Sequence, residues 1–330
     1  MRYYPFNIRA SLTALLIVAG AALAQQAPLP AAAQDALDQG RAAMNQALST
    51  YEAQYPDRAL WQEAFRHGRR AQTLAPEHPE PQLFLAEAYS RSNWFGPAWN
   101  AWLAYLDQGN LLDADATPLF SEVGSQQGYN YYRQGRLSDA ADVYRRIIDE
   151  VPFDLEAHTW MGRLLIEMGQ PEQAISYWQT VVDRNPGDSR AAYFLELARD
   201  QSRWGTEAVN AFRQGVEFHE QGALERARER FARATTHNSR FPDAWAWLGR
   251  VAFERGDYAD ARTFYERASS LAPSNQTYSY FREESERRVE TGVGGARGTP
   301  DVDGAEGARG ADGAEGAPAV DGAEGNDRTP

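Results

Sequence analysis

The chain has 330 residues, of which 43% are hydrophobic and 24% are charged, and its formal net charge is −13. This acidic balance makes nucleic-acid phosphates and anionic lipid heads unfavourable partners. The absence of cysteine excludes disulfide bonds, thiol catalysis and a lipid anchor attached to cysteine. No stretch shows the alternation typical of strands, and residues that favour helices fill the chain, so the composition predicts an all-α fold.

The N-terminus has the pattern of a secretory signal peptide. Arg2 and Arg9 precede an apolar run at residues 12–22, and Ala22 and Ala24 supply small side chains before Gln25. An apolar run of this length is shorter than the ~20 residues that span a bilayer. We therefore expect residues 1–24 to be removed, with no membrane span left afterwards, and the chain to be exported to the periplasm or cell envelope, or secreted.

Small and aromatic residues then recur at a spacing of 34. In residues 121–188 the two matching sets are Gly128, Gly135, Ala140, Tyr144 and Pro152, then Gly162, Gly169, Ala174, Trp178 and Pro186. In residues 208–275 the two sets are Gly215, Gly222, Ala227, Phe231 and Ala234, then Gly249, Gly256, Ala261, Tyr265 and Ala268. Self-similarity at this period predicts a stack of small helical units, a solenoid.

This pattern resembles the tetratricopeptide repeat, whose length is 34 residues. In residues 242–275, Gly249 sits where that family lets a second helix approach closely, and Ala261 is the small surface that this helix presents. Pro273 prevents the second helix from continuing. The resemblance implies a right-handed α-solenoid of helix pairs, in which structural positions fall on Gly128, Ala140, Gly162, Ala174, Pro186, Gly215, Ala227, Gly249, Ala261 and Pro273.

The repeat register divides the rest of the chain. We expect an N-terminal helical region at 25–112 with two degenerate repeats, 45–78 and 79–112, then a short insert at 113–120, two repeats at 121–188, an insert helix or hinge at 189–207, two repeats at 208–275 and a capping helix at 276–290. Gly68 replaces a large aromatic residue of the degenerate repeat 45–78. In the second insert we expect one unpaired helix from Ser189 to about Arg203, followed by a turn at Gly205.

The C-terminal residues, 291–330, differ in composition from the rest. The sequence Asp-Gly-Ala-Glu-Gly begins at Asp303, Asp312 and Asp321 among residues that are almost all small or charged. Such a segment cannot bury enough apolar surface to fold, so we expect it to be disordered. A calcium loop is the alternative, but Ala305 stands where a third ligand belongs.

Motifs for catalysis are absent from the sequence. The five histidines are scattered without metal-ligand spacing, and there is no glycine-rich phosphate loop or serine nucleophile elbow. The acidic run at 283–286 is typical of the solvated face of a terminal helix. We therefore expect no enzyme activity, no metal and no cofactor.

The family resemblance implies a binding groove instead, lined by the first helix of each pair. Its inward positions would be Tyr129, Tyr132, Arg163, Ile166, Phe212, Val216, Arg250 and Phe253, with Thr159 and His219 at further such positions. Aromatic residues and arginine are typical of binding hot spots. An alternative is that Phe212, Val216 and Phe253 pack against the insert helix. The lysines and asparagines with which the family clamps a C-terminal carboxylate are not matched.

These observations predict an exported scaffold or adaptor that binds a protein or peptide partner in the periplasm or cell envelope. The alternative is a structural envelope component that self-associates through the ends of the solenoid and its aromatic surface. An enzyme on a helical scaffold would need a cleft with paired carboxylates, which the sequence does not announce.

Overall fold

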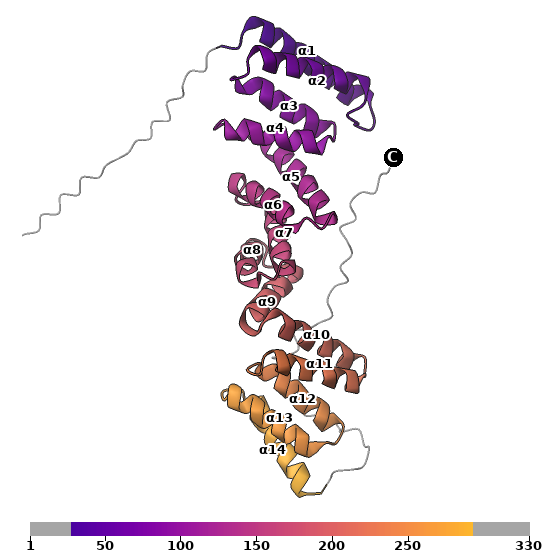
Figure 1. Ribbon diagram of the computed structural model, residues 1–330, viewed down its shortest axis with the longest axis vertical. Coiled ribbons are helices and arrows are strands. Elements are labelled where there is room, and N and C mark those ends of the chain that lie inside the picture. The colour runs from indigo at the N-terminus through magenta and orange to yellow at the C-terminus, as the bar shows by residue number, and fades with distance from the viewer. Residues whose placement is uncertain (1–27, 293–330) are drawn as a thin grey trace, which may run out of the picture. The chain divides into compact units, whose positions relative to one another are not determined.

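The computed structural model describes residues 28–292, which form fourteen α-helices and no strand (Figure 1). The predicted all-α class is confirmed. The described part of the chain divides into two compact units between Val123 and Gly124, which we call unit 1 and unit 2. The expected signal peptide, 1–24, and nearly all of the expected tail, 291–330, lie outside the described residues, so both stay predictions.

Unit 1 is a stack of helices around an aromatic core. Its helices are α1 (Ala31–Thr50), α2 (Ala59–Leu74), α3 (Pro79–Arg91), α4 (Phe95–Asp107) and the first part of α5 (Ala116–Arg133). Trp61, Phe65 and Trp102 are fully buried. A Cβ atom at Gly68 would lie 2.7 Å from Leu85 Cδ2, so the missing side chain lets α2 and α3 approach closely.

Two boundaries in unit 1 differ from the predicted register. Residue 45, where a degenerate repeat was expected to begin, lies inside α1, and residues 51–58 form an eight-residue connection to α2. The expected insert at 113–120 is partly helical, because Asp113 Oδ1 accepts a hydrogen bond from the Ala116 backbone N–H at 2.8 Å and so caps α5. The buried ring of Phe120 then holds this extension against α4.

Unit 2 contains the clear repeats. After the second part of α5 it continues with α6 (Leu137–Glu150), α7 (Leu155–Glu167), α8 (Pro171–Arg184), α9 (Ser189–Trp204), α10 (Thr206–Glu220), α11 (Leu224–His237), α12 (Pro242–Glu254), α13 (Tyr258–Leu271) and α14 (Gln276–Glu290). From α6 onward each helix packs against the next along the chain (Figure 1). Within unit 2 these helices form a solenoid.

Glycine in the first helix of each pair makes room for an aromatic ring from the second. A Cβ atom at Gly162 would lie 2.5 Å from Trp178 Nε1, and one at Gly249 would lie 2.8 Å from Tyr265 Cδ2. The same relationship joins Gly128 to Tyr144 and Gly215 to Phe231. The turns between the helices of these pairs use glycine in the left-handed region, with φ between 71° and 82° at Gly135, Gly169, Gly222 and Gly256.

Unit 2 also has a longer period of 87 residues, which the 34-residue spacing does not predict. Helices α6, α7, α8 and α9 begin 87 residues before α11, α12, α13 and α14, at Leu137, Leu155, Pro171 and Ser189 against Leu224, Pro242, Tyr258 and Gln276. Helices α5 and α10 end 87 residues apart, at Arg133 and Glu220. Unit 2 is therefore built from two equivalent five-helix modules, and α9, expected as an insert, is the closing helix of the first module, as α14 is of the second.

The closing helices α9 and α14 differ in the face that points away from their own module. On α9, Tyr193 lies under the Arg213 guanidinium of α10, with 4.4 Å between Cζ and the ring centroid, and Leu197 and Trp204 pack against the start of α10. The residues 87 positions after Tyr193, Leu197 and Trp204 are Tyr280 and Glu284 on α14 and Thr291 directly after it. Arg288 and Glu284 pair with each other at 2.8 Å. Helix α14 therefore ends unit 2 with a largely polar face, as terminal caps of repeat proteins do.

Candidate binding surface

The predicted groove residues of the first module lie on two adjacent first helices, α5 and α7. The structure brings Tyr132 and Arg163 together: Arg163 Nη2 donates a hydrogen bond to the Tyr132 hydroxyl at 2.7 Å, and its guanidinium carbon lies 4.9 Å from the tyrosine ring centroid. Tyr129 lies beside them, with its ring 6.5 Å from that of Tyr132. Ile166 is half-buried on the same helix as Arg163.

Two residues outside the prediction complete this arrangement. Glu167 Oε1 accepts hydrogen bonds from Arg163 Nε at 2.9 Å and from the Tyr132 hydroxyl at 3.1 Å. The Trp160 ring lies 5.2 Å from that of Tyr132 and 5.3 Å from the Arg163 guanidinium carbon. We refer to Tyr132, Trp160, Arg163 and Glu167 as the first cluster.

The same arrangement recurs 87 residues later, on α10 and α12. Arg250 Nε donates to Glu254 Oε1 at 3.1 Å, and the Arg250 guanidinium carbon lies 4.7 Å from the Trp247 ring. His219 takes the place of the tyrosine: its Nε2 lies 2.8 Å from Glu254 Oε2 and its ring 5.0 Å from that of Trp247. We refer to His219, Trp247, Arg250 and Glu254 as the second cluster.

The charges within both clusters are mutually stabilised. Burial opposes the charge of Glu254, but the hydrogen bonds and charges of His219 and Arg250 outweigh burial and hold the pKa of its carboxyl below its ordinary value. Burial likewise opposes the charge of Arg163, yet its hydrogen bonds and the charge of Glu167 raise its pKa. Each cluster therefore carries a fixed arginine–glutamate pair against a tryptophan face.

Three other predicted groove residues mainly hold helices together. Val216 is only 7% exposed and belongs to a buried cluster with Phe231 and Trp247, so it is not available to a partner. The half-buried Phe212 ring lies 5.6 Å from that of Phe231 on α11. Phe253 packs against α13 and α14, with its ring 5.9 Å from that of Phe281. Val216 and Phe253 thus pack against helices other than α9, whereas the alternative interpretation placed them against that helix.

A sequence signal for the missed residues does exist. In both modules a tryptophan precedes the arginine by three positions and a glutamate follows it by four, as in Trp160-x-x-Arg163-x-x-x-Glu167. This spacing places all three on neighbouring turns of one helix. The 34-residue period concealed it, since the pattern is found in alternate repeats and returns only after 87 residues.

The structure allows two further statements about residues 28–292. None of their helices is long and apolar enough to cross a membrane. In the same part of the chain, no three histidine, aspartate or glutamate side chains gather where they could hold a metal ion.

Comparison with known proteins identifies the repeats. Sequence models of the tetratricopeptide repeat match residues 131–197 and 212–275. The human protein O-mannosyl-transferase TMTC1 is 25% identical over 175 residues, which cover 47% of this chain and 20% of that protein. Its mouse counterpart is 24% identical over 142 residues, or 43% of this chain and 14% of that protein. The chain therefore spans a fifth or less of the length of these relatives.

Similar solved structures are also repeat proteins. YrrB, described as a TPR protein with an unusual peptide-binding site, is 17% identical with a TM-score of 0.29, covering 66% of this chain and 97% of that one. A tetratricopeptide repeat protein from Parabacteroides merdae is 12% identical with a TM-score of 0.36, covering 78% and 100%. The TPR2AB domain of yeast Sti1, in its pHSP90 complex, is 13% identical with a TM-score of 0.25, covering 78% and 99%.

Proposed function

Because the chain belongs to the tetratricopeptide repeat family, we propose that it is a binding scaffold whose unit 2 holds a protein or peptide partner through the first and second clusters. The observation that carries this proposal is the recurrence of one tryptophan, arginine and glutamate arrangement after 87 residues. Helix packing does not require an arginine–glutamate pair beside a tryptophan, yet this arrangement is present in both modules. A partner that meets both clusters would meet the same chemistry twice.

The arginine of the second cluster is more exposed than that of the first. Arg250 is exposed, whereas Arg163 is half-buried. Glu254 accepts a hydrogen bond from Nε of Arg250. Within residues 28–292 the two Nη atoms of Arg250 donate no hydrogen bond. These Nη groups are therefore oriented by the glutamate and the tryptophan but free to donate to a carboxylate or carbonyl of the partner. Orientation of this kind reduces the entropy lost on binding.

The proposal includes the absence of catalysis. The carboxyl group of Glu254 has a lowered pKa through His219 and Arg250, which favours its ionised form and does not suit it to donate a proton. The tetratricopeptide fold is typically a non-catalytic scaffold. The relatives named O-mannosyl-transferases match only through a fifth or less of their length, which gives no support for carrying their activity over.

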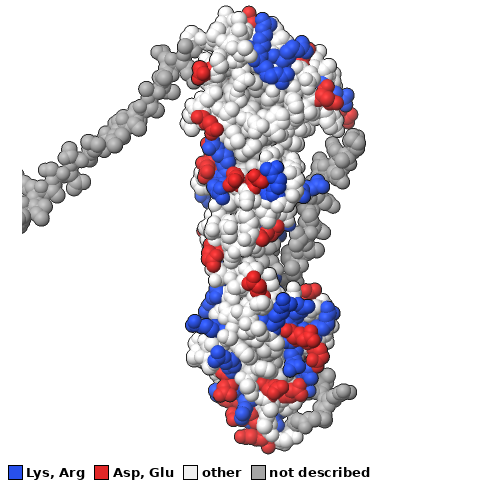
Figure 2. Space-filling view, in the orientation of Figure 1, with Lys and Arg blue, Asp and Glu red and all other residues white. Residues whose placement is uncertain are grey.

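The helix that closes the second module favours a partner of another kind over a second copy of this chain. The polar face of α14, with its paired Glu284 and Arg288, lacks the leucine and tryptophan by which α9 receives the next module. In addition, acidic and basic side chains are interspersed over α10–α14 in the view of Figure 2. Stacking of copies through this end of unit 2 is therefore disfavoured. We place the scaffold in the periplasm or cell envelope because of the N-terminal pattern alone.

Affinity capture with matched variants tests this function. The full chain, Arg163→Ala/Arg250→Ala and the control Arg190→Ala/Arg228→Ala, which removes two exposed arginines elsewhere in unit 2, are each used to capture partners from envelope extract of the source cells. We expect a protein that the full chain and the control retain and the cluster variant loses. Identical sets of captured proteins for all three would contradict the proposal.

A further inference from the structure

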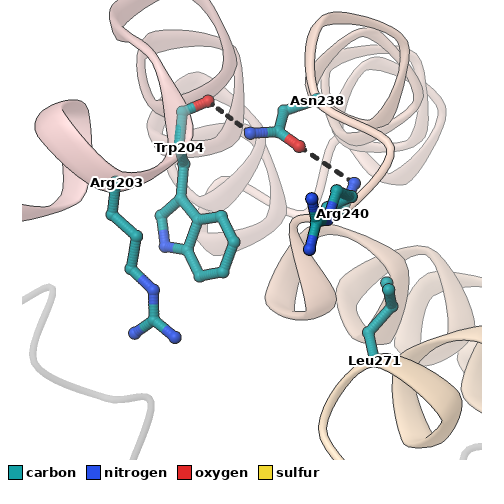
Figure 3. A pocket seen from close by; sticks show the side chains of 5 residues that line it. All are labelled: Arg203, Trp204, Asn238, Arg240 and Leu271. Atoms are coloured by element: carbon teal, nitrogen blue, oxygen red, sulfur yellow. Dashed lines mark hydrogen bonds between the residues drawn. The ribbon is translucent and has the colours of Figure 1, made fainter.

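A pocket of about 430 Å³ lies at the junction between the two modules of unit 2. It is lined by the C-terminal end of α9, the connection from α11 to α12 and the end of α13, through Arg203, Trp204, Asn238, Arg240 and Leu271 (Figure 3). None of these residues belongs to the first or second cluster. The pocket is therefore a separate site from the proposed partner surface.

The wall of the pocket is held in place by backbone contacts. Asn238 Nδ2 donates to the Trp204 carbonyl at 2.8 Å, and Asn238 Oδ1 accepts from the Arg240 backbone N–H at 2.9 Å (Figure 3). The Trp204 ring stacks on Phe241 with 5.1 Å between centroids. The indole face and the Arg240 backbone thus have fixed positions.

Two guanidinium groups without a carboxylate partner line this site. Arg203 lies with its Cζ 4.4 Å from the Trp204 ring centroid, and Figure 3 shows Arg240 to the other side of that indole. Within residues 28–292 neither arginine forms an ion pair, and both are exposed. The charges of Asp200, three residues before Arg203, and of Arg203 act on each other, and the charges of Glu196 and Asp243 act on Asp200 in turn. The charged residues that line the pocket itself are these two arginines, which suits it to a carboxylate.

This pair of arginines is not a by-product of the repeat. The residues 87 positions from Arg203 and Arg240 are Glu290 and Phe153. In the first module Phe153 instead lies against Arg184, with 4.1 Å from Cζ to its ring. Within residues 28–292 the paired arginines therefore belong to the junction between the modules and are not repeated 87 residues away.

We propose that this pocket binds the acidic Asp-Gly-Ala-Glu motif of the chain's own C-terminal segment. That motif begins at Asp303, Asp312 and Asp321, and residues 293–330 contain eight acidic residues against three arginines. The charge of the segment is thus complementary to the pocket, and three copies of one motif raise the local concentration of the ligand at a single site.

The length of the segment is sufficient for this contact. Leu271 lines the pocket, and α14 begins five residues later. Glu290, at the end of α14, therefore lies about one helix length, roughly 22 Å, from the pocket. The twelve residues between Glu290 and the first motif can span about 40 Å. All three motifs can therefore reach Arg203 and Arg240.

The absence of cysteine permits a direct test in the full chain. A nitroxide spin label is attached at Ala314→Cys, inside the middle motif. The signal observed by NMR is the indole N–H resonance of Trp204, which is assigned as the one that Trp204→Phe removes. At low ionic strength we expect the label to broaden this resonance, and the broadening to fall about twofold or more in Arg203→Gln/Arg240→Gln or at high salt. The control Arg190→Gln/Arg228→Gln, with the same change in charge, should leave it unchanged.

Neutralising the motifs identifies the group that binds. The full chain in which Asp303, Glu306, Asp312, Glu315, Asp321 and Glu324 are replaced by Asn or Gln should lose the broadening as the pocket variant does. No broadening in the parent chain at low salt would overturn the proposal. So would broadening that survives either the pocket variant or the neutralised motifs. The partner capture described above does not depend on this contact, so the two proposals can fail separately.

Discussion

Arg250 donates to Glu254 one helical turn further along α12, and the glutamate is held from its other oxygen by His219 of α10. The pair thus joins two successive first helices of the solenoid, and Arg163 with Glu167 does the same between α7 and α5 through Tyr132. Each cluster therefore has two consequences: it ties neighbouring repeats together, and it orients an arginine on the surface.

Replacement of Gly249 by leucine should destabilise unit 2. A Cβ atom there would lie 2.8 Å from the Tyr265 ring, which is buried and cannot move aside, so we expect a loss of about 1 to 3 kcal/mol in the free energy of unfolding. Urea unfolding followed by circular dichroism measures it. The control is Gly96→Leu, because a Cβ atom at Gly96 has no neighbour within 4 Å. Equal stability of the two variants would mean that the close approach at Gly249 is not required.

Replacement of Asp200 by asparagine should stabilise the protein in a pH-dependent way. Burial, with the charges of Glu196 and Asp243, raises the pKa of Asp200 from 3.8 to about 6. A carboxyl group whose pKa is raised by folding costs stability above that pKa, and the cost disappears as the pH falls toward 4. Although neighbouring atoms partly desolvate the carboxyl group, the residue as a whole is exposed to water, so solvent screening reduces the expected gain at pH 7 to about 0.5–1 kcal/mol.

Unfolding of wild type and Asp200→Asn at pH 7 and pH 4 measures this effect. The difference should shrink at the lower pH, whereas Asp149→Asn, at an exposed position on α6, should show no such change. A gain that is the same at both pH values would show that the titration of Asp200 is not its cause.

The sequence predicts the repeat core of unit 2 well because its signal is steric. A glycine such as Gly162 and the ring of Trp178 that fills its place are set by local helix packing, and they recur at a fixed period. In unit 1 the aromatic core holds the helices instead, and the extended α1 and α5 follow from the connection at 51–58 and from the cap at Asp113. Contacts of this kind do not recur at a fixed spacing, so the sequence does not predict them.

The binding surface is less predictable because exposure depends on neighbouring helices. Val216 occupies an inward position of the repeat, yet the Trp247 side chain of the next repeat helps to bury it. Glu167 lies outside the family's inward positions, but its side chain reaches Tyr132 on the first helix of the preceding repeat. Position in the register therefore places a residue on a helix face, and only its neighbours determine whether a partner can touch it.

N-terminal sequencing of the protein from its native envelope tests export. The apolar run at 12–22 and the small residues Ala22 and Ala24 predict a mature chain that begins at Gln25. Edman degradation or mass spectrometry of the terminal peptide measures it directly. A chain that still begins at Met1 would contradict cleavage and favour a retained anchor.

Removal of the C-terminal segment should leave stability unchanged. Residues from 293 onward hold almost no large apolar side chains, and contacts between exposed charges contribute about 0–1 kcal/mol. A chain that ends at Gly292 should therefore unfold at the same urea concentration as the full chain. A clear loss of stability would show that the segment contributes packing that its composition does not indicate.

Partner affinity should depend on the clusters rather than on the C-terminal segment. Tyr132 and Arg250 belong to different clusters, so a partner that runs along the solenoid would meet both. Loss of an aromatic or arginine hot spot costs about 2 kcal/mol or more. With the captured partner purified, Tyr132→Ala and Arg250→Ala should each weaken binding about tenfold or more while helicity is unchanged, since 1.4 kcal/mol is tenfold in affinity.

The chain that ends at Gly292 should bind as tightly as the full chain. If instead both variants bind normally and truncation abolishes binding, the C-terminal segment is the recognition element and the clusters serve only to join the repeats.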